Sequence, residues 1–286
     1  MSGRTFGICI TVQEEGGEDL PWELHDLGAA GVETRDATTM TGVTAADMVV
    51  YIAGFDDENR RNQAADVLGR RYPGMELSRL EITDDGWSEG WKKFFKPVVL
   101  EKVQVITPWM EAPEERDVTI VIDPGQAFGT GGHATTRLIL QFIEKLSDPG
   151  LPDTILDVGT GSGVLAIACA RLGASAIVGV DVEEPAVEAA RENAERNHVG
   201  DAVSVMVASP EQVNGEWPLV LANIQLAVFL EHADNIANLV SPGGILLISG
   251  VLAEQRERCL ALWPQFSLRE VMQEEEWLAM HLEKNS

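Results

Sequence analysis

The segment 155–166, with the sequence ILDVGTGSGVLA, joins an apolar strand to an apolar helix through three glycines, Gly159, Gly161 and Gly163. Glycines between a strand and a helix let the backbone come close to a ligand at the carboxyl edge of a sheet. This pattern predicts a binding site for a nucleoside derivative.

Two cofactors fit this turn, S-adenosylmethionine and a dinucleotide. Gly161, Gly163 and Ala166 satisfy the spacing Gly-x-Gly-x-x-Ala that dinucleotide sites allow. Asp157 at the strand end would repel a pyrophosphate, whereas it suits the ammonium and sulfonium of S-adenosylmethionine. The glycines also begin at Gly159, two residues after Asp157, while the dinucleotide spacing begins well past the strand end. These points favour S-adenosylmethionine, and a dinucleotide-dependent oxidoreductase stays as the alternative.

Two further predicted strands end in a polar residue. Strand 176–180 ends in Asp181, whose carboxylate can accept hydrogen bonds from both ribose hydroxyls of an adenosine. Strand 219–222 ends in Asn223, whose side-chain oxygen can accept hydrogen bonds from an amine about to be methylated. Amino-methyltransferases of bases look similar here, but usually continue with two prolines and an aromatic, where residues 224–226 are Ile-Gln-Leu. An aliphatic amine is therefore the favoured acceptor; for both polar residues a simple helix cap is the alternative.

A glycine-rich loop, residues 123–136, opens another predicted helix. Such a loop can fold over a ligand, with Phe128 as an apolar wall and Thr135 or Thr136 supplying donors, although a plain surface loop is the alternative. His133 has no metal partner nearby in the sequence and is interpreted as structural. No metal site or disulfide framework is predicted, because the three cysteines lie far apart, at Cys9, Cys169 and Cys259.

From residue 100 onward the sequence predicts strands that alternate with helices. Strands are expected at 118–122, 154–158, 176–180, 219–222 and 243–249, and helices at 135–145, 164–172, 185–197, 225–239 and 254–263. Two last strands, 267–273 and 277–283, flank the acidic turn 274–276. The order predicts an α/β fold with a doubly wound, mostly parallel, seven-stranded Rossmann-like sheet and an antiparallel strand at one side.

The first part of the chain, residues 1–82, predicts a smaller α+β domain. Its order of strands and helices is strand 5–12, helix 20–27, strands 28–36 and 47–53, helix 58–71 and strand 77–82. This order fits a ferredoxin-like sandwich, an architecture that can serve recognition. Residues 83–99 are expected to form a linker helix with Trp87, Trp91 and Phe94 on one face, either packed against the larger domain, 100–286, or acting as an interdomain arm.

The charge balance narrows the choice of partner. The chain has 21 Lys and Arg against 46 Asp and Glu, for a net charge of −25. A nucleic-acid binder needs basic clusters, so no direct nucleic-acid binding is expected, whereas a basic protein suits this surface. The chain has no apolar run of roughly 18 residues and no signal-peptide pattern at its start, so we expect a cytoplasmic protein with no membrane partner, and a monomer.

Taken together, these motifs resemble the ribosomal protein L11 methyltransferase family, over nearly the whole chain. The segments that carry the resemblance are 27–33, 87–97, 123–136, 156–166, 179–181 and 222–224, and the loop from Phe128 to Thr136 is the most specific. This chain departs from the family at two positions. Thr160 stands where many members have cysteine, and Gly132 stands where a bulkier residue is common. Neither change removes a side chain that the chemistry needs.

The resemblance implies a class I methyltransferase domain that uses S-adenosylmethionine, preceded by a domain that holds the basic ribosomal protein. The residues that it implies for cofactor binding are Phe128, Gly129, Thr136, Gly159, Gly161, Asp181 and Asn223, with Phe128 near the methyl group. The implied enzyme is a protein N-methyltransferase acting on lysine side chains and the N-terminal amine of ribosomal protein L11. Lysines of another protein are the alternative substrate.

A lysine amine has a pKa near 10.4, so it must lose its proton before it attacks the methyl group, and burial helps by disfavouring the ammonium. Asn223 is expected to act as the catalytic residue by orienting the amine, with the proton lost to water. Most of the acceleration would then come from proximity and alignment. A binding protein that has lost turnover is a further alternative.

Overall fold

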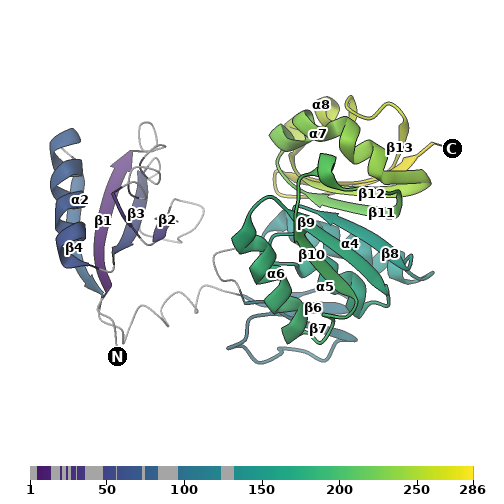
Figure 1. The fold of residues 1–286 in the computed structure, drawn as a ribbon, viewed down its shortest axis with the longest axis horizontal. Coiled ribbons are helices and arrows are strands. Elements are labelled where there is room, and N and C mark those ends of the chain that lie inside the picture. The colour runs from purple at the N-terminus through teal and green to yellow at the C-terminus, as the bar shows by residue number, and fades with distance from the viewer. Residues whose placement is uncertain are drawn as a thin grey trace. The chain divides into compact units, whose positions relative to one another are not determined.

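The computed structural model in Figure 1 describes residues 5–13, 20, 24, 27–29, 31–35, 48–55, 57–72, 75–82, 96–123 and 132–285. The chain divides into two compact units, Met1–Phe94 and Phe95–Ser286. Residues 83–95 of the expected linker helix, with Trp87, Trp91 and Phe94, lie outside the described residues. The linker and the domain boundaries that we derived from the sequence therefore stay predictions.

The N-terminal unit contains a four-stranded antiparallel sheet in the order β2-β3-β1-β4. Its elements are β1 (Thr5–Gln13), β2 (Gly31–Arg35), β3 (Met48–Phe55), α2 (Glu58–Arg71) and β4 (Glu76–Ile82). Ile8 and Ile10 are two residues apart on the central strand β1, so their side chains lie on the same face of the sheet. Both are fully buried in a core that they share with Leu68 of α2. The four strands and the helix 58–71 expected along this part of the chain are confirmed, and Leu20 and Leu24 of the first expected helix are buried in the same core.

The C-terminal unit is built on a seven-stranded sheet in the order β10-β9-β8-β11-β12-β14-β13. The strands are β8 (Thr154–Val158), β9 (Ala176–Asp181), β10 (Val203–Val207), β11 (Trp217–Asn223), β12 (Val240–Leu252), β13 (Phe266–Glu274) and β14 (Trp277–Lys284). The first five strands of this order pair in parallel, and β14 pairs antiparallel with both of its neighbours. The predicted sheet and its antiparallel hairpin are thus confirmed.

Helices cover both faces of this sheet, as Figure 1 shows. They are α4 (Ala134–Ser147), α5 (Val164–Arg171), α6 (Glu184–Arg196), α7 (Leu226–Leu239) and α8 (Arg256–Leu260). Ile155 of β8 packs into the core formed with α4 and α5, whereas its neighbour Leu156 packs into a second core with α7 and α8. Because the strands are buried on both sides, their carboxyl ends are the part of the sheet where polar side chains can meet a ligand. None of the helices described is long and apolar enough to span a membrane.

Three details differ from the sequence prediction. The strand expected at 118–122 is β7 (Val118–Val121), and it lies outside the large sheet, in a three-stranded sheet with β5 (Val98–Val99) and β6 (Val103–Ile106). Strands β5, β6 and β10 were not predicted. Strand β10 is an edge strand whose Met206 and Val207 are exposed, so its burial pattern does not alternate regularly. The helix expected at 254–263 is shorter, because a 3-10 turn, Ala253–Gln255, precedes α8.

Candidate functional site

A cavity of about 570 Å³ lies where the carboxyl ends of β8, β9, β11 and β12 meet the first turn of α4. This volume falls in the range of roughly 300–1,000 Å³ that small-molecule sites occupy. Five of the residues predicted to bind a cofactor line it, namely Thr136, Gly159, Gly161, Asp181 and Asn223. Phe128 and Gly129, the other two, lie outside the described residues.

The glycine turn after β8 forms one wall of the cavity. Gly159, Gly161 and Gly163 have φ angles of 70°, 53° and 82°, which side chains rarely tolerate. The N–H of Gly159 donates to the carbonyl of Val180 at 2.8 Å, which ties the turn to the end of β9. A Cβ atom at Gly159 would lie 2.4 Å from Cγ2 of Ile224, so this position has no room for a side chain. The turn therefore exposes backbone to the cavity, as the sequence predicted.

The carboxylate of Asp181 is held in place by two backbone N–H groups. Oδ2 accepts from Gly161 at 3.0 Å and Oδ1 accepts from Glu183 at 3.1 Å. A carboxylate has about four lone-pair sites, so each oxygen can still accept a hydrogen bond from a ligand. Glu183, rather than Asp181, occupies the N-cap of α6. The alternative interpretation of Asp181 as a helix cap is thus wrong.

Asp157, which we expected to select a cation, does not line the cavity. It is fully buried beneath the turn, where the hydroxyl of Thr160 donates to its Oδ2 at 2.7 Å. Burial raises the pKa of Asp157 to about 6; the hydrogen bond from Thr160 lowers this pKa and the charge of Asp181 raises it. The side chains on β8 alternate between the two faces of the sheet. Asp157 therefore lies on the same face as Ile155, the face covered by α4 and α5. Its charge can therefore act on a ligand only at a distance.

Asn223 at the end of β11 contacts the first turn of α4. Its Nδ2 donates to Oγ1 of Thr136 at 3.3 Å, and Thr136 is fully buried. Within the described part of the chain, no hydrogen bond occupies the Oδ1 acceptor of Asn223. Gln225 is the N-cap of α7, so the interpretation of Asn223 as a helix cap is also wrong. The structure brings the predicted catalytic amide into the same cavity as Asp181.

The residue after Asn223, Ile224, is packed between Gly159 of the turn after β8 and Gly250 of β12. A Cβ at Gly159 would strike its side chain, and a Cβ at Gly250 would lie 2.3 Å from its carbonyl oxygen. Gly250 has a φ of 84° and lines the cavity, yet we did not predict it. Its signal in the sequence is a glycine that directly follows the apolar strand 243–249.

His133 and Trp277 form another part of the cavity wall. His133 is the N-cap of α4, and its Nδ1 accepts from the N–H of Thr135 at 3.4 Å, a contact that agrees with a structural role. Its ring meets that of Trp277 edge to face, with centroids 5.1 Å apart. Burial and the nearby Arg137 lower the pKa of His133. Trp277 was not predicted from the sequence to line this cavity. Among the residues that the structure describes, no group of three or more potential metal ligands occurs.

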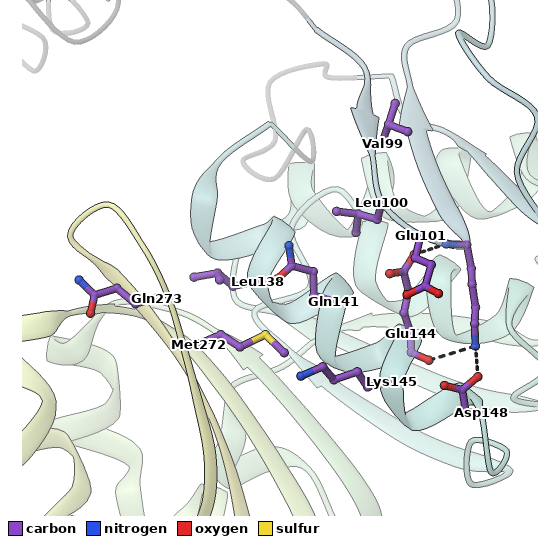
Figure 2. Close-up of a pocket in the computed structure, with 11 residues that line it drawn as sticks. Val99, Leu100, Glu101, Leu138, Gln141, Glu144, Lys145, Asp148, Met272 and Gln273 are labelled. Carbon is purple, nitrogen blue, oxygen red and sulfur yellow. Dashed lines mark hydrogen bonds and ion pairs between the residues drawn. The ribbon is translucent and has the colours of Figure 1, made fainter.

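A second hollow of about 660 Å³ lies at the other end of α4, between that helix, the β5–β6 connection and β13 (Figure 2). Four charged side chains that line it form ion pairs or hydrogen bonds with neighbouring parts of the protein, namely Lys102, Glu144, Lys145 and Asp148. The carboxylate of Glu144 accepts from the backbone N–H groups of Lys102 and Val103 at 2.8 and 2.7 Å, and the ammonium of Lys102 pairs with Asp148. These bonds join elements together, so the hollow has a structural use.

The comparisons with known proteins agree with the geometry. A family model described as ribosomal protein L11 methyltransferase matches residues 5–285. A protein of that name from Pelobacter propionicus is 38% identical, with 98% of this chain and 97% of the relative covered. One from Sorangium cellulosum is 35% identical, with 91% and 83% covered. The crystal structure of ribosomal protein L11 methylase from Lactobacillus delbrueckii subsp. bulgaricus has a TM-score of 0.61 at 27% identity, covering 67% of this chain and 100% of that one. The chain therefore belongs to the ribosomal protein L11 methyltransferase family.

Proposed function

We propose that this protein transfers the methyl group of S-adenosylmethionine to amines of ribosomal protein L11, namely lysine side chains and the N-terminal amine. The observation that carries the proposal is the meeting of the glycine turn, Asp181 and Asn223 in one cavity, in a chain of this family. We further propose a monomer that acts in the cytoplasm, where newly made ribosomal protein is available.

The residues of the cavity fit S-adenosylmethionine, which supplies an electrophilic methyl group on a sulfonium when it is bound. The carboxylate of Asp181 is fixed by backbone N–H groups and keeps lone pairs for the ribose hydroxyls. Gly159 and Gly161 let the backbone approach the ligand closely, since neither has a side chain in the way. Phe128 and Gly129 are proposed to contribute to the same site.

Asn223 is proposed to orient the acceptor amine. Its Nδ2 is used by Thr136, which leaves Oδ1 to accept a hydrogen bond from the amine. Apolar side chains, among them Val158, Ile224 and Val228, share the cavity and disfavour an ammonium there, so they help the amine to lose its proton to water. Alignment of a neutral amine with the methyl group would then supply most of the rate enhancement.

The charge of the chain supports a basic protein as substrate. A net charge of −25 attracts lysine-rich surfaces and speeds their association at low ionic strength. We propose that residues 1–82 bind the ribosomal protein and that methyl transfer takes place in the cavity of the C-terminal unit.

The test is a methyl-transfer assay with labelled S-adenosylmethionine and purified, unmodified ribosomal protein L11, followed by intact-mass analysis. We expect mass gains of about 14 units per methyl group, which count the additions. An Asn223→Ala variant should still bind the cofactor but lose turnover, and wild-type turnover in this variant would remove the proposed role of Asn223. Cofactor binding without transfer to L11 would contradict the substrate, and absence of cofactor binding would contradict the activity itself.

A further inference from the structure

Two buried asparagines lie one turn apart at the end of α6, Asn193 in its last turn and Asn197 at its C-cap. The side chains of Asn193 and Asn197 are 1% and 3% exposed. An amide in the interior needs hydrogen-bond partners, because burying it without them costs free energy. The partners of these two amides therefore show what each residue does.

Both amides bond to one edge of the chain at the end of β7: Asn197 to the last residue of the strand, and Asn193 to Asp123, two residues further on. Asn197 accepts from the N–H of Val121 at 2.8 Å and donates to its carbonyl at 2.7 Å. Asn193 accepts from the N–H of Asp123 at 2.9 Å and donates to its carbonyl at 3.4 Å. Alternate residues of an extended chain present both groups to one side, so the two amides replace a neighbouring strand at this edge.

Only Asn193 also reaches the glycine turn. Its Nδ2 donates to the carbonyl of Ser162 at 3.0 Å, between Gly161 and Gly163, and Ser162 is fully buried. The helix comes this close because Gly163 has no side chain: a Cβ there would lie 3.1 Å from the Cβ of Ala190. The remaining bond of the Asn197 amide goes to the backbone of its own helix, at the carbonyl of Asn193.

From this geometry we propose that Asn193 is a positioning residue for the cofactor. Its amide joins the glycine turn to Asp123 and so keeps the N–H of Gly161 where the carboxylate of Asp181 accepts it. This inference rests on the proposed function, because it takes the cavity as the site of S-adenosylmethionine. Asn197 bonds to the N–H and carbonyl of Val121 at the end of β7 but has no bond to the glycine turn.

The two asparagines give a matched pair of variants, Asn193→Ala and Asn197→Ala. Each removes one buried amide and its bonds to β7, so both should lower the thermal midpoint. Only Asn193→Ala should weaken the binding of S-adenosylmethionine measured by calorimetry, by about fivefold to tenfold, which corresponds to about one hydrogen bond. The KM for the cofactor should rise by the same factor, with kcat at saturating cofactor and the KM for the protein substrate unchanged.

Asn193→Ser is the second variant, used as the deciding one if Asn193→Ala does not fold. It keeps a small uncharged polar side chain at this buried position and removes the amide donor to Ser162, so it should weaken cofactor binding as well. Equal cofactor affinity in the variants at 193 and in Asn197→Ala would overturn the inference. A wild-type protein that fails to bind S-adenosylmethionine would instead overturn the proposed function, and the two failures are thus distinguished.

Discussion

The two hollows at the ends of α4 are similar in size, about 570 and 660 Å³, but they are built from different chemistry. The cavity proposed for the cofactor is lined by strand ends and by glycines, and the carboxylate of Asp181 in it keeps lone pairs for a ligand. In the hollow of Figure 2, Glu144 accepts from backbone N–H groups and Lys102 pairs with Asp148, so the charges hold neighbouring elements together. Volume alone therefore says little about function, whereas polar groups fixed on rigid strand ends indicate a ligand site.

The largest effect is expected for Gly159→Ala, which would disrupt the cavity proposed for the cofactor. The new Cβ would lie 2.4 Å from Ile224, at a φ of 70°. We expect cofactor binding to become undetectable by calorimetry and the free energy of unfolding to fall by about 1–3 kcal/mol.

The control is Gly173→Ala, which has a φ of 109° with no atom within 4 Å of the new Cβ. It carries the backbone strain without the collision and lies outside the cavity, so it should keep cofactor binding. Equal loss of binding in both variants would show that the collision with Ile224 is not the cause.

The next effect is that of Asp181→Ala. It removes the carboxylate proposed to accept the ribose hydroxyls, and charged hydrogen bonds contribute about 1.5–3 kcal/mol each. The Kd for S-adenosylmethionine should rise about 100-fold to 1,000-fold. Asp148→Ala removes a carboxylate from the second hollow and should leave this Kd unchanged. A higher Kd in Asp148→Ala would contradict a purely structural role for the second hollow.

A third prediction concerns the pH dependence of stability. The folded protein keeps a proton on Asp157 up to about pH 6, because its pKa is raised from 3.8, whereas the unfolded chain releases it near its ordinary pKa. Between these pH values the folded state binds more protons, so the free energy of unfolding falls as the pH rises through this window. Asp157 should therefore destabilise the protein by about 2–3 kcal/mol above pH 6.

Asp157→Asn keeps an acceptor for the hydroxyl of Thr160 and removes the charge. By urea denaturation this variant should be more stable than the wild type by about 2–3 kcal/mol at pH 7.5 and by about 1 kcal/mol at pH 4.5. A difference that does not change with pH would argue against a buried, titrating carboxylate at this position.

The smallest effect is expected for Glu144→Gln in the second hollow. The variant keeps an acceptor for the N–H groups of Lys102 and Val103 but loses the charge that strengthens both hydrogen bonds. Stability should fall by about 1–2 kcal/mol, with the Kd for the cofactor unchanged. A weaker affinity for S-adenosylmethionine would mean that the two ends of α4 are coupled.

The parts of the site that were predictable from the sequence are those that local patterns encode. Gly159, Asp181 and Asn223 each follow an apolar strand directly, and parallel strands bring their carboxyl ends to one edge. Asp157 was misjudged because the pattern does not say which face of the sheet a strand residue takes. Trp277 enters the cavity only because β14 pairs with β12, a contact between distant parts of the chain.

The fold shows the same division. Helix α2 and strand β8 have the limits that periodicity predicted, whereas the placement of β7 beside β6 depends on pairing that no local pattern specifies. The hydrogen bond from Asn193 to Ser162 joins residues 31 positions apart, so no local pattern in the sequence predicts it either.

The packing of Ile224 between Gly159 and Gly250 has a consequence for redesign of the enzyme. Gly159 directly follows β8, Ile224 directly follows β11 and Gly250 lies in β12, so a change at one of the three positions requires compatible changes at the other two. An engineer who seeks a new acceptor by changing Asn223 alone would keep the old backbone position, since the neighbours of Ile224 fix it. Libraries that vary residues 159, 224 and 250 together are the ones that can move it.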